Sequence, residues 1–284
     1  MGLEDYFHLY LSTVIWALLL PLVFYLPERL APAEEGQPRA KRIVNLVYTP
    51  VAIAIIFLLQ ALFGPVYSLA LTSSGGGLLS KFISEQRGLA GQLIFAVAFA
   101  VVWDIWQYWV HRLQHTNNFL WQTHKFHHTD TALNSTTQAR HHALHNLPVL
   151  IGYLPIILLF GPQQPHFVAA FLMFRLWGFV NHANVRFNFG PLTPVVAGPQ
   201  WHRIHHSIQT QHLNRNFATF FPFIDILFGT YYAPQKGEYP PTGSPEGQTG
   251  DLREATVAPL LAWNKMARLQ VGKLRAMRRQ RQGL

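Results

Sequence analysis

Long stretches without a charged side chain set the strongest limit on how this chain can fold. Residues 7–26 and 43–62 contain no Asp, Glu, Lys or Arg, and the stretch 91–110 is interrupted only by Asp104. About 20 apolar residues are enough to cross the hydrocarbon core of a bilayer. Charged residues make up 12% of the chain, roughly half their usual share in a soluble domain. The sequence therefore predicts an all-α integral membrane protein.

Two shorter apolar stretches lie further along, at 147–160 and at 167–180, and the second of them contains Arg175. Pro162 and Pro165 lie between them and predict a turn. The pair is compatible with two tilted spans or with a hairpin that enters and leaves the membrane on one side. We therefore expect about four transmembrane helices, or three plus a hairpin.

Basic residues near the span ends predict the orientation of the chain. The loop between the first two spans holds four of them, the next loop holds only Lys81 and Arg87, and the tail beyond Trp263 holds seven. This distribution places the first loop, the tail and the end of the third span on the cytoplasmic side of a bacterial inner membrane or the endoplasmic reticulum. The net charge of +9 is then explained by topology and anionic lipid, and nucleic acid is not an expected partner.

These features divide the chain into three parts. Residues 1–90 are expected to form the N-terminal membrane helices and their loops. Residues 91–232 contain 14 of the 15 histidines and form the candidate catalytic membrane domain, with only His8 outside it. Residues 233–284 begin with a segment rich in Pro and Gly and end in a basic helix.

The histidines are grouped in short boxes. The boxes are HRLQH at 111–115, HKFHH at 124–128, RHHALH at 140–145 and HRIHH at 202–206, and His182 stands alone near a span end. Neutral imidazole is a common ligand of divalent transition metals, and positions i, i+3 and i+4 share one face of a helix. The eight histidines of the HRLQH, HKFHH and HRIHH boxes are more than one tetrahedral zinc ion needs, so the spacing predicts two metals.

Acidic residues are too few for a carboxylate-bridged metal pair. Between residues 91 and 232 the chain has only Asp104, Asp130 and Asp225, whereas soluble di-iron bundles use four Glu. Asp104 is costly inside a span and is therefore a functional candidate. We expect Asp104 and Asp225 to accept the N–H of ligating imidazoles; the alternative is a buried Asp that caps a loop.

The ordered motifs resemble the fatty acid hydroxylase superfamily, also called the sterol desaturase family. The matching pieces are WDIWQYWVHRLQH, WQTHKFHHTD, NHANVRF, HRIHHS and NRNFATFFPFIDILFGTY, and the resemblance extends over residues 102–232. The resemblance implies an integral-membrane histidine-box di-iron oxygenase whose cytosolic helical cap holds the dinuclear site. The ligands that it implies are His111, His115, His124, His127, His128, His182, His202, His205 and His206.

One further ligand position has an ambiguous register. His142 matches a family histidine that usually precedes Pro, but Ala143 occupies the Pro position here, and His145 is a weaker alternative. The implied cofactors are two iron ions, for which zinc could substitute in purified protein. The implied partners are the bilayer, a lipid substrate and an external electron donor, either a ferredoxin or a b-type cytochrome with its reductase.

The leading functional hypothesis is an O2-dependent hydroxylase that acts on a C–H bond of a fatty acyl, sterol or related lipid. A desaturase of the same family is the alternative. A zinc-dependent membrane hydrolase is a further alternative, although the chain has no HExxH motif to supply a general base. A metal transporter would need histidines within its spans, whereas most of those here lie at span ends and in loops.

Overall fold

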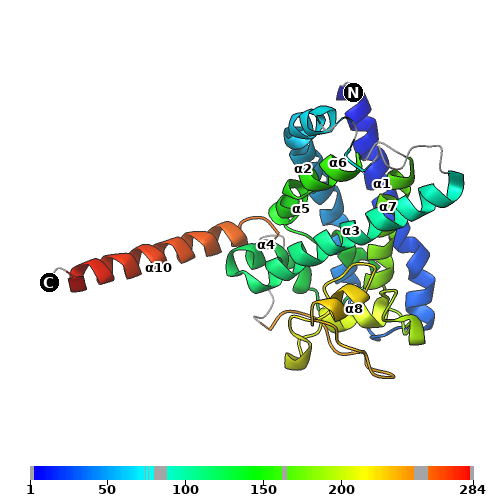
Figure 1. The fold of residues 1–284 in the computed structure, drawn as a ribbon. Coiled ribbons are helices and arrows are strands. Elements are labelled where there is room, and N and C mark those ends of the chain that lie inside the picture. Colours follow the sequence, from blue (N-terminus) through cyan, green and yellow to red (C-terminus); the bar gives the residue numbers. More distant parts are fainter. Residues whose placement is uncertain are drawn as a thin grey trace.

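A computed structural model describes residues 3–73, 75, 77–79, 88–161, 165–245 and 255–281. The described residues are mostly helical and contain no strand beyond two isolated β-bridges (Figure 1). Ten α-helices are described: α1 Leu3–Leu30, α2 Arg39–Ser73, α3 Gly88–Thr116, α4 Asn118–His128, α5 Leu147–Ile151, α6 Tyr153–Phe160, α7 Pro165–His182, α8 Pro199–His205, α9 Phe223–Leu227 and α10 Ala258–Arg281.

Three of these helices are long and apolar enough to cross a membrane. The most apolar 18-residue windows of α1, α2 and α3 have mean hydropathies of 2.1, 2.3 and 1.8, and only 6%, 22% and 28% of their residues are buried inside the protein. Apolar helices whose side chains face outward are expected to contact lipid. The all-α membrane fold is confirmed, and the three spans lie where the sequence predicts them.

The two shorter apolar stretches become three helices. α5 and α6 divide the first stretch at Gly152, and α6 ends at Gly161, which adopts the left-handed conformation with φ 59°. Such a glycine is a common helix terminator. α7 then packs against α3 and α8. The predicted turn residue Pro162 lies outside the described residues, so the choice between two spans and a hairpin stays a prediction.

A buried apolar cluster joins these helices inside the membrane part. Its members come from α3, α6 and α7: Phe95, Phe99, Ala100, Trp103, Ile156, Phe160 and Phe174. Aromatic rings contribute large contact areas to such packing. The cluster fixes α3 against α6 and α7, and the C-terminal turns of α3 therefore have a defined position relative to His182 at the end of α7.

The chain reverses its direction directly after α3. Asn117 caps α4, since its side-chain oxygen accepts the backbone N–H groups of Phe119 and Leu120 at 2.9 and 3.1 Å. α4 packs back against α3. This hairpin brings the histidines of the second box next to those of the first.

The last turn of α1, which contains Glu28, and the loop that follows it, which contains Glu34, are attached to the segments that carry the histidines. The carboxylate of Glu28 accepts the backbone N–H groups of Ser135 and Asn184 at 2.8 and 3.0 Å. Glu34 forms a 2.8 Å ion pair with the buried guanidinium of Arg203 on α8. Arg203 lies between two histidines of the last box, so the first loop directly supports the helix that carries them.

The C-terminal helix α10 projects away from the rest of the molecule (Figure 1). Its first turns dock on α4, where Trp263 stacks on Phe119 with ring centroids 4.3 Å apart and donates its indole N–H to the Phe119 carbonyl at 2.8 Å. Residues 267–277 of the helix are exposed and include Arg268, Lys273 and Arg275. It is the predicted basic helix, whereas the predicted domain boundaries stay untested.

Candidate metal centre

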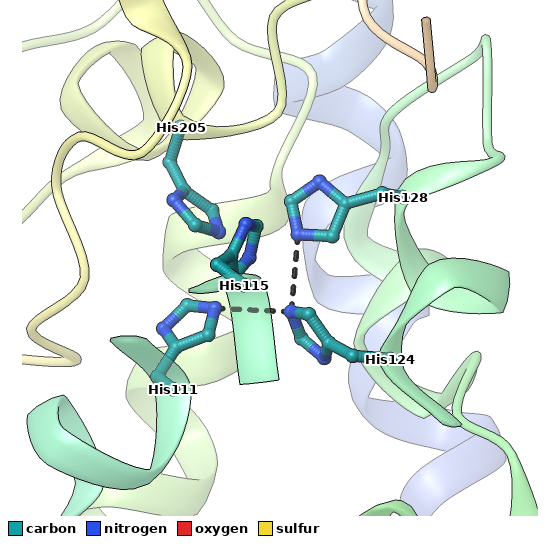
Figure 2. A group of neighbouring side chains, drawn as sticks. All are labelled: His111, His115, His124, His128 and His205. Carbon is teal, nitrogen blue, oxygen red and sulfur yellow. Dashed lines mark hydrogen bonds between the residues drawn. The ribbon is translucent and has the colours of Figure 1, made fainter. Parts of the chain in front are cut away.

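Nine histidines gather into two neighbouring clusters. In each cluster, the candidate ligand nitrogens all lie within 4.8 Å of one another. Cluster 1 contains His111, His115, His124, His128 and His205 (Figure 2). Cluster 2 contains His127, His182, His202 and His206. These are the nine ligands that the resemblance implies without His142, and the structure brings all of them together.

Each HxxHH box divides its histidines between the two clusters. On α4, His124 and His128 are one turn apart and point into cluster 1, whereas His127 points into cluster 2. The last box reverses this distribution, because its middle histidine, His205, joins cluster 1 and His202 and His206 join cluster 2. The spacing of these boxes therefore serves two adjacent centres.

Imidazole rings of the two clusters pack directly against one another. The rings of His128 in cluster 1 and His206 in cluster 2 stack with centroids 4.3 Å apart, and those of His205 in cluster 1 and His206 lie 5.2 Å apart. His206 is thus in contact with two members of the other cluster. This proximity suits a dinuclear centre better than two independent sites.

Ring nitrogens within each cluster are separated by the distances expected between ligands of one metal. His124 Nε2 lies 3.1 Å from the Nε2 atoms of both His111 and His128 (Figure 2). In cluster 2, His182 Nε2 lies 3.0 Å from His127 Nε2 and 3.1 Å from His202 Nε2. Metal–nitrogen bonds of about 2.1 Å place neighbouring ligands about 3.0–3.4 Å apart.

Backbone carbonyls fix the orientation of four of these rings. The Nδ1 atoms of His111 and His205 lie 2.8 Å from the carbonyls of Phe217 and Arg215. Those of His127 and His182 lie 3.2 and 2.6 Å from the carbonyls of Arg140 and Gly178, respectively. A carbonyl oxygen only accepts hydrogen bonds, so Nδ1 carries the hydrogen and Nε2 keeps its lone pair.

This tautomer assignment is the test of whether a metal fits. His127 Nε2 and His182 Nε2 face each other at 3.0 Å, and each ring has its hydrogen on the opposite nitrogen. Two bare lone pairs at this distance repel each other unless a cation lies between them. The buried Nε2 atoms of His115 and His205 also have no hydrogen-bond partner. The donor set therefore fits a pair of transition-metal ions.

The buried histidines of the boxes at 124–128 and 202–206 are held in their neutral form. Burial, reinforced by neighbouring imidazoles, lowers the pKa of His124, His128 and His202 well below the ordinary value of 6.5. Burial likewise lowers the pKa of His206 well below that value. Neutral imidazole is the form that binds metal, so ions would not have to compete with protons for these nitrogens at neutral pH.

Asp104 and Asp225 accept hydrogen bonds from backbone N–H groups. The sequence had led us to expect that they would accept the N–H of ligating imidazoles. The carboxylate of Asp104 accepts the N–H groups of Thr219, Phe220 and Phe221 at 2.7–2.9 Å. Asp225 similarly accepts from residues 217 and 218 at 2.8 and 2.9 Å, and from the hydroxyl of Thr230 at 2.7 Å. Both carboxylates cap the 217–221 loop, whose Phe217 carbonyl orients His111.

His142 lies outside both clusters. Its Nε2 donates to the carbonyl of Thr256 at 2.9 Å, and its Nδ1 accepts the N–H of Leu144 at 3.1 Å. Both ring nitrogens are therefore occupied by backbone groups. Its neighbours His141 and His145 instead form a third group with His124, with candidate ligand nitrogens within 4.8 Å of one another. His145 thus approaches the centre, whereas the residue favoured from the sequence does not.

Arg140 is a site residue that the sequence interpretation missed. Its buried guanidinium lies 3.9 Å from the centroid of the Phe126 ring and donates to the Phe126 carbonyl at 2.9 Å. It also donates to Asn45 at 3.2 Å and to Thr129 at 3.0 Å. These bonds hold in place the Arg140 carbonyl that orients His127. The only sequence signal was a lone Arg beside a histidine box.

Fold and site together define a class: a helical membrane protein with two adjacent all-histidine clusters suited to a pair of transition metals. Residues 96–230 match the family model described as fatty acid hydroxylase. This match confirms, for these residues, the resemblance noted in the sequence. No solved structure matches the chain significantly.

Several curated proteins are similar to this chain. It is 29% identical over 182 residues to an ornithine lipid hydroxylase of Rhizobium tropici, which covers 64% of the chain and 53% of that protein. It is 33% identical over 131 residues to the alkylglycerol monooxygenase of Homo sapiens, covering 46% and 29%. It is 28% identical over 165 residues to a Delta(7)-sterol 5(6)-desaturase of Gibberella zeae, covering 57% and 44%. The chain thus spans about half or less of each relative.

Proposed function

We propose that the protein is an O2-dependent hydroxylase that acts on a C–H bond of a lipid and uses a dinuclear iron centre. The observation that carries the proposal is the pair of adjacent all-imidazole clusters within a fatty acid hydroxylase domain. The names of the similar hydroxylase and monooxygenase support this reaction type. Two iron ions held by these histidines would supply the reduction of O2 that oxidises the substrate C–H bond.

The chain's own contribution is binding, orientation and exclusion of water. Nine imidazoles would hold the metals, and backbone carbonyls keep four of the rings in the metal-binding tautomer. Phe217 and Trp121 pack against the His115 ring with centroids 5.2 Å away. These apolar walls limit access of water to the centre, which protects a reactive site from side reactions.

Proximity to the membrane supports a lipid substrate. His111 and His115 lie in the last turns of α3, a candidate span, so a lipid can approach the centre from the bilayer. The aromatic residues of α3 and α7 that could line a channel for such a lipid are Trp103, Trp106, Phe174 and Trp177. Trp103 and Phe174 belong to the packed cluster between α3, α6 and α7, so they contribute to helix packing.

The electron source is a further part of the proposal. The chain has no cysteine, so it has no thiolates to hold an iron–sulfur cluster. We therefore propose an external donor, a ferredoxin or a b-type cytochrome with its reductase. A basic cytoplasmic surface that includes α10 would attract an acidic carrier through electrostatic steering. The cytoplasmic placement of the histidine boxes belongs to the same proposal.

Desaturation at the same centre is a second candidate, favoured by the similarity to the sterol desaturase. A zinc hydrolase has less support, because neither cluster contains a carboxylate among the described residues that could act as a general base. Hydroxylation and desaturation begin with removal of the same kind of hydrogen. They differ in the second step at the substrate, which adds oxygen in one case and removes another hydrogen in the other.

The test uses the full chain purified into lipid nanodiscs. We expect two irons per chain and O2 consumption that depends on a reductant. Mass spectrometry of lipids from cells with and without the protein should show a substrate increased by one oxygen atom, whereas a loss of two hydrogens would identify a desaturase. One zinc ion per chain, with no reductant-dependent O2 uptake, would refute both assignments.

A further inference from the structure

His124 differs from the four carbonyl-oriented ligands in the partner of its second nitrogen. Its Nε2 lies 3.1 Å from the Nε2 atoms of His111 and His128 within cluster 1. Its Nδ1 faces another imidazole, with His145 Nδ1 3.2 Å away. An imidazole nitrogen can donate or accept, so this contact alone does not fix the tautomer of His124.

Gln114 resolves the direction of this hydrogen bond. The Nε2 atom of Gln114 lies 2.9 Å from the backbone carbonyl of His145, which only accepts, and this contact identifies the atom as the amide NH2 group. The same NH2 lies 3.2 Å from His145 Nδ1. Since an NH2 group only donates, His145 Nδ1 must be the acceptor and carries no hydrogen.

The tautomer of His124 is set by this chain of contacts. His145 Nδ1 has no hydrogen to give, so the hydrogen between the two rings belongs to His124 Nδ1. His124 Nε2 is then left with a bare lone pair directed at cluster 1. We propose that Gln114 and His145 are positioning residues that act as a tautomer lock, fixing His124 as a metal ligand without contacting the metal themselves.

The location of the two residues suits this role. Gln114 is only 1% exposed and lies on α3 between His111 and His115. His145 lies on the short 3-10 helix Ala143–Asn146, which packs against α4. The lock therefore connects α3, the 3-10 helix and α4 around the ligand His124. His141 also packs against His145, with ring centroids 4.0 Å apart.

A different use of the same residues is a third metal site formed by His124, His141 and His145, whose candidate ligand nitrogens lie within 4.8 Å of one another. The hydrogen bonds to His145 argue against it, because Gln114 and His124 Nδ1 share the single lone pair of His145 Nδ1 as their acceptor. Metal stoichiometry separates the two arrangements, since the lock predicts two ions per chain and the third site predicts three.

The proposal rests on the metal centre of the proposed function and can be tested without enzymatic activity. Metal-free full-length protein in nanodiscs would be titrated with Co2+ in competition with a chromophoric chelator, and its visible absorption recorded. Gln114→Glu keeps the side-chain shape but replaces the NH2 donor, and His145→Ala removes the acceptor. In both variants we expect Co2+ binding at one of the two sites to weaken by about 10- to 100-fold.

Two further variants separate the lock from a general structural effect. His145→Glu retains an acceptor for His124 and should recover most of the affinity lost in His145→Ala. Gln270→Glu, a matched change on the exposed part of α10, should behave as wild type. Circular dichroism would establish that every variant keeps its helices.

Each alternative result has a defined meaning. Wild-type Co2+ affinity in both Gln114→Glu and His145→Ala would overturn the lock while leaving the metal centre intact. Equal losses in His145→Ala and His145→Glu would overturn it as well. Three Co2+ per wild-type chain, falling to two in His145→Ala, would establish the third site instead. Absence of Co2+ binding by wild type would refute the proposed centre itself.

Discussion

His111 donates its Nδ1 hydrogen to the backbone carbonyl of Phe217 across 2.8 Å, although the two residues are 106 positions apart in the sequence. The backbone N–H of Phe217 is itself held by the carboxylate of Asp225 at 2.8 Å. The next residues of the loop are held by Asp104. The metal-facing orientation of His111 thus depends on two carboxylates that never touch the ring.

Replacing Asp104 tests this dependence. In Asp104→Asn a single oxygen must serve three backbone N–H groups, and the new NH2 group can face one of these donors. We expect the free energy of unfolding to fall by about 1–3 kcal/mol and metal affinity to fall at the site that contains His111. Thermal unfolding and metal titration measure the two effects. Asp5→Asn, at the exposed start of α1, is the control; equal behaviour of the two variants would contradict the capping role.

The division of histidines between two clusters predicts metal stoichiometry. His128→Ala removes a ligand from cluster 1 and His206→Ala removes one from cluster 2. We expect each variant to retain about one strongly bound metal per chain instead of two, and to lose O2-dependent activity, because the proposed reaction needs both ions. Elemental analysis of the purified proteins gives the count. His8→Ala should retain both ions; loss of both ions from either cluster variant would indicate a single cooperative site.

His142 should not be needed for metal binding. Both of its ring nitrogens are bonded to backbone groups, at Thr256 and Leu144. We expect His142→Ala to keep the wild-type metal content while losing about 1 kcal/mol of stability through the two lost hydrogen bonds. Elemental analysis and thermal unfolding would be compared on one preparation. A missing metal equivalent would restore His142 to the ligand set.

Acidification should destabilise the metal-free protein. Burial lowers the pKa of buried histidines of the metal centre, such as His124, His128 and His202, well below 6.5. The unfolded chain therefore binds more protons than the folded chain once the pH falls below about 6.5. The stability contribution of the neutral imidazoles is complete above this value and decreases as the pH falls further.

The measurement is the unfolding temperature of metal-free protein between about pH 7.5 and about pH 5. We expect a fall toward acid pH, with a smaller fall when metal is bound, since bound metal opposes protonation of its ligands. An unfolding temperature that is constant or rises on acidification would show that the histidines are not held neutral by the fold.

The sequence predicts the spans and the metal ligands because both are encoded locally. An uncharged stretch long enough for α1, α2 or α3 is visible in one window, and the HxxHH spacing on α4 and α8 reflects one helical turn. The features that the sequence does not reveal are encoded between distant segments. Asp104 meets the backbone of residues 219–221, and such a bond leaves no mark on the spacing of side chains.

The third histidine box, at 140–145, also has a conformation that its sequence alone does not reveal. Among His141, His142 and His145, the choice of which ring turns toward the centre depends on a short 3-10 helix and on the carbonyl of Thr256. Similarity to a family motif favours His142, whereas the backbone geometry turns it away. The support that Arg140 gives to His127 likewise depends on bonds to Asn45 and Thr129, which no local pattern connects.

The carboxylate of Asp104 also constrains how the protein is made. The three N–H groups that satisfy it belong to residues 115–117 positions later in the chain, so α3 leaves the ribosome long before they exist. During that interval a span carries an uncompensated polar group, which is costly in a bilayer. The final packing of α3 and the orientation of His111 therefore both wait for the 217–221 loop to be synthesised and to dock.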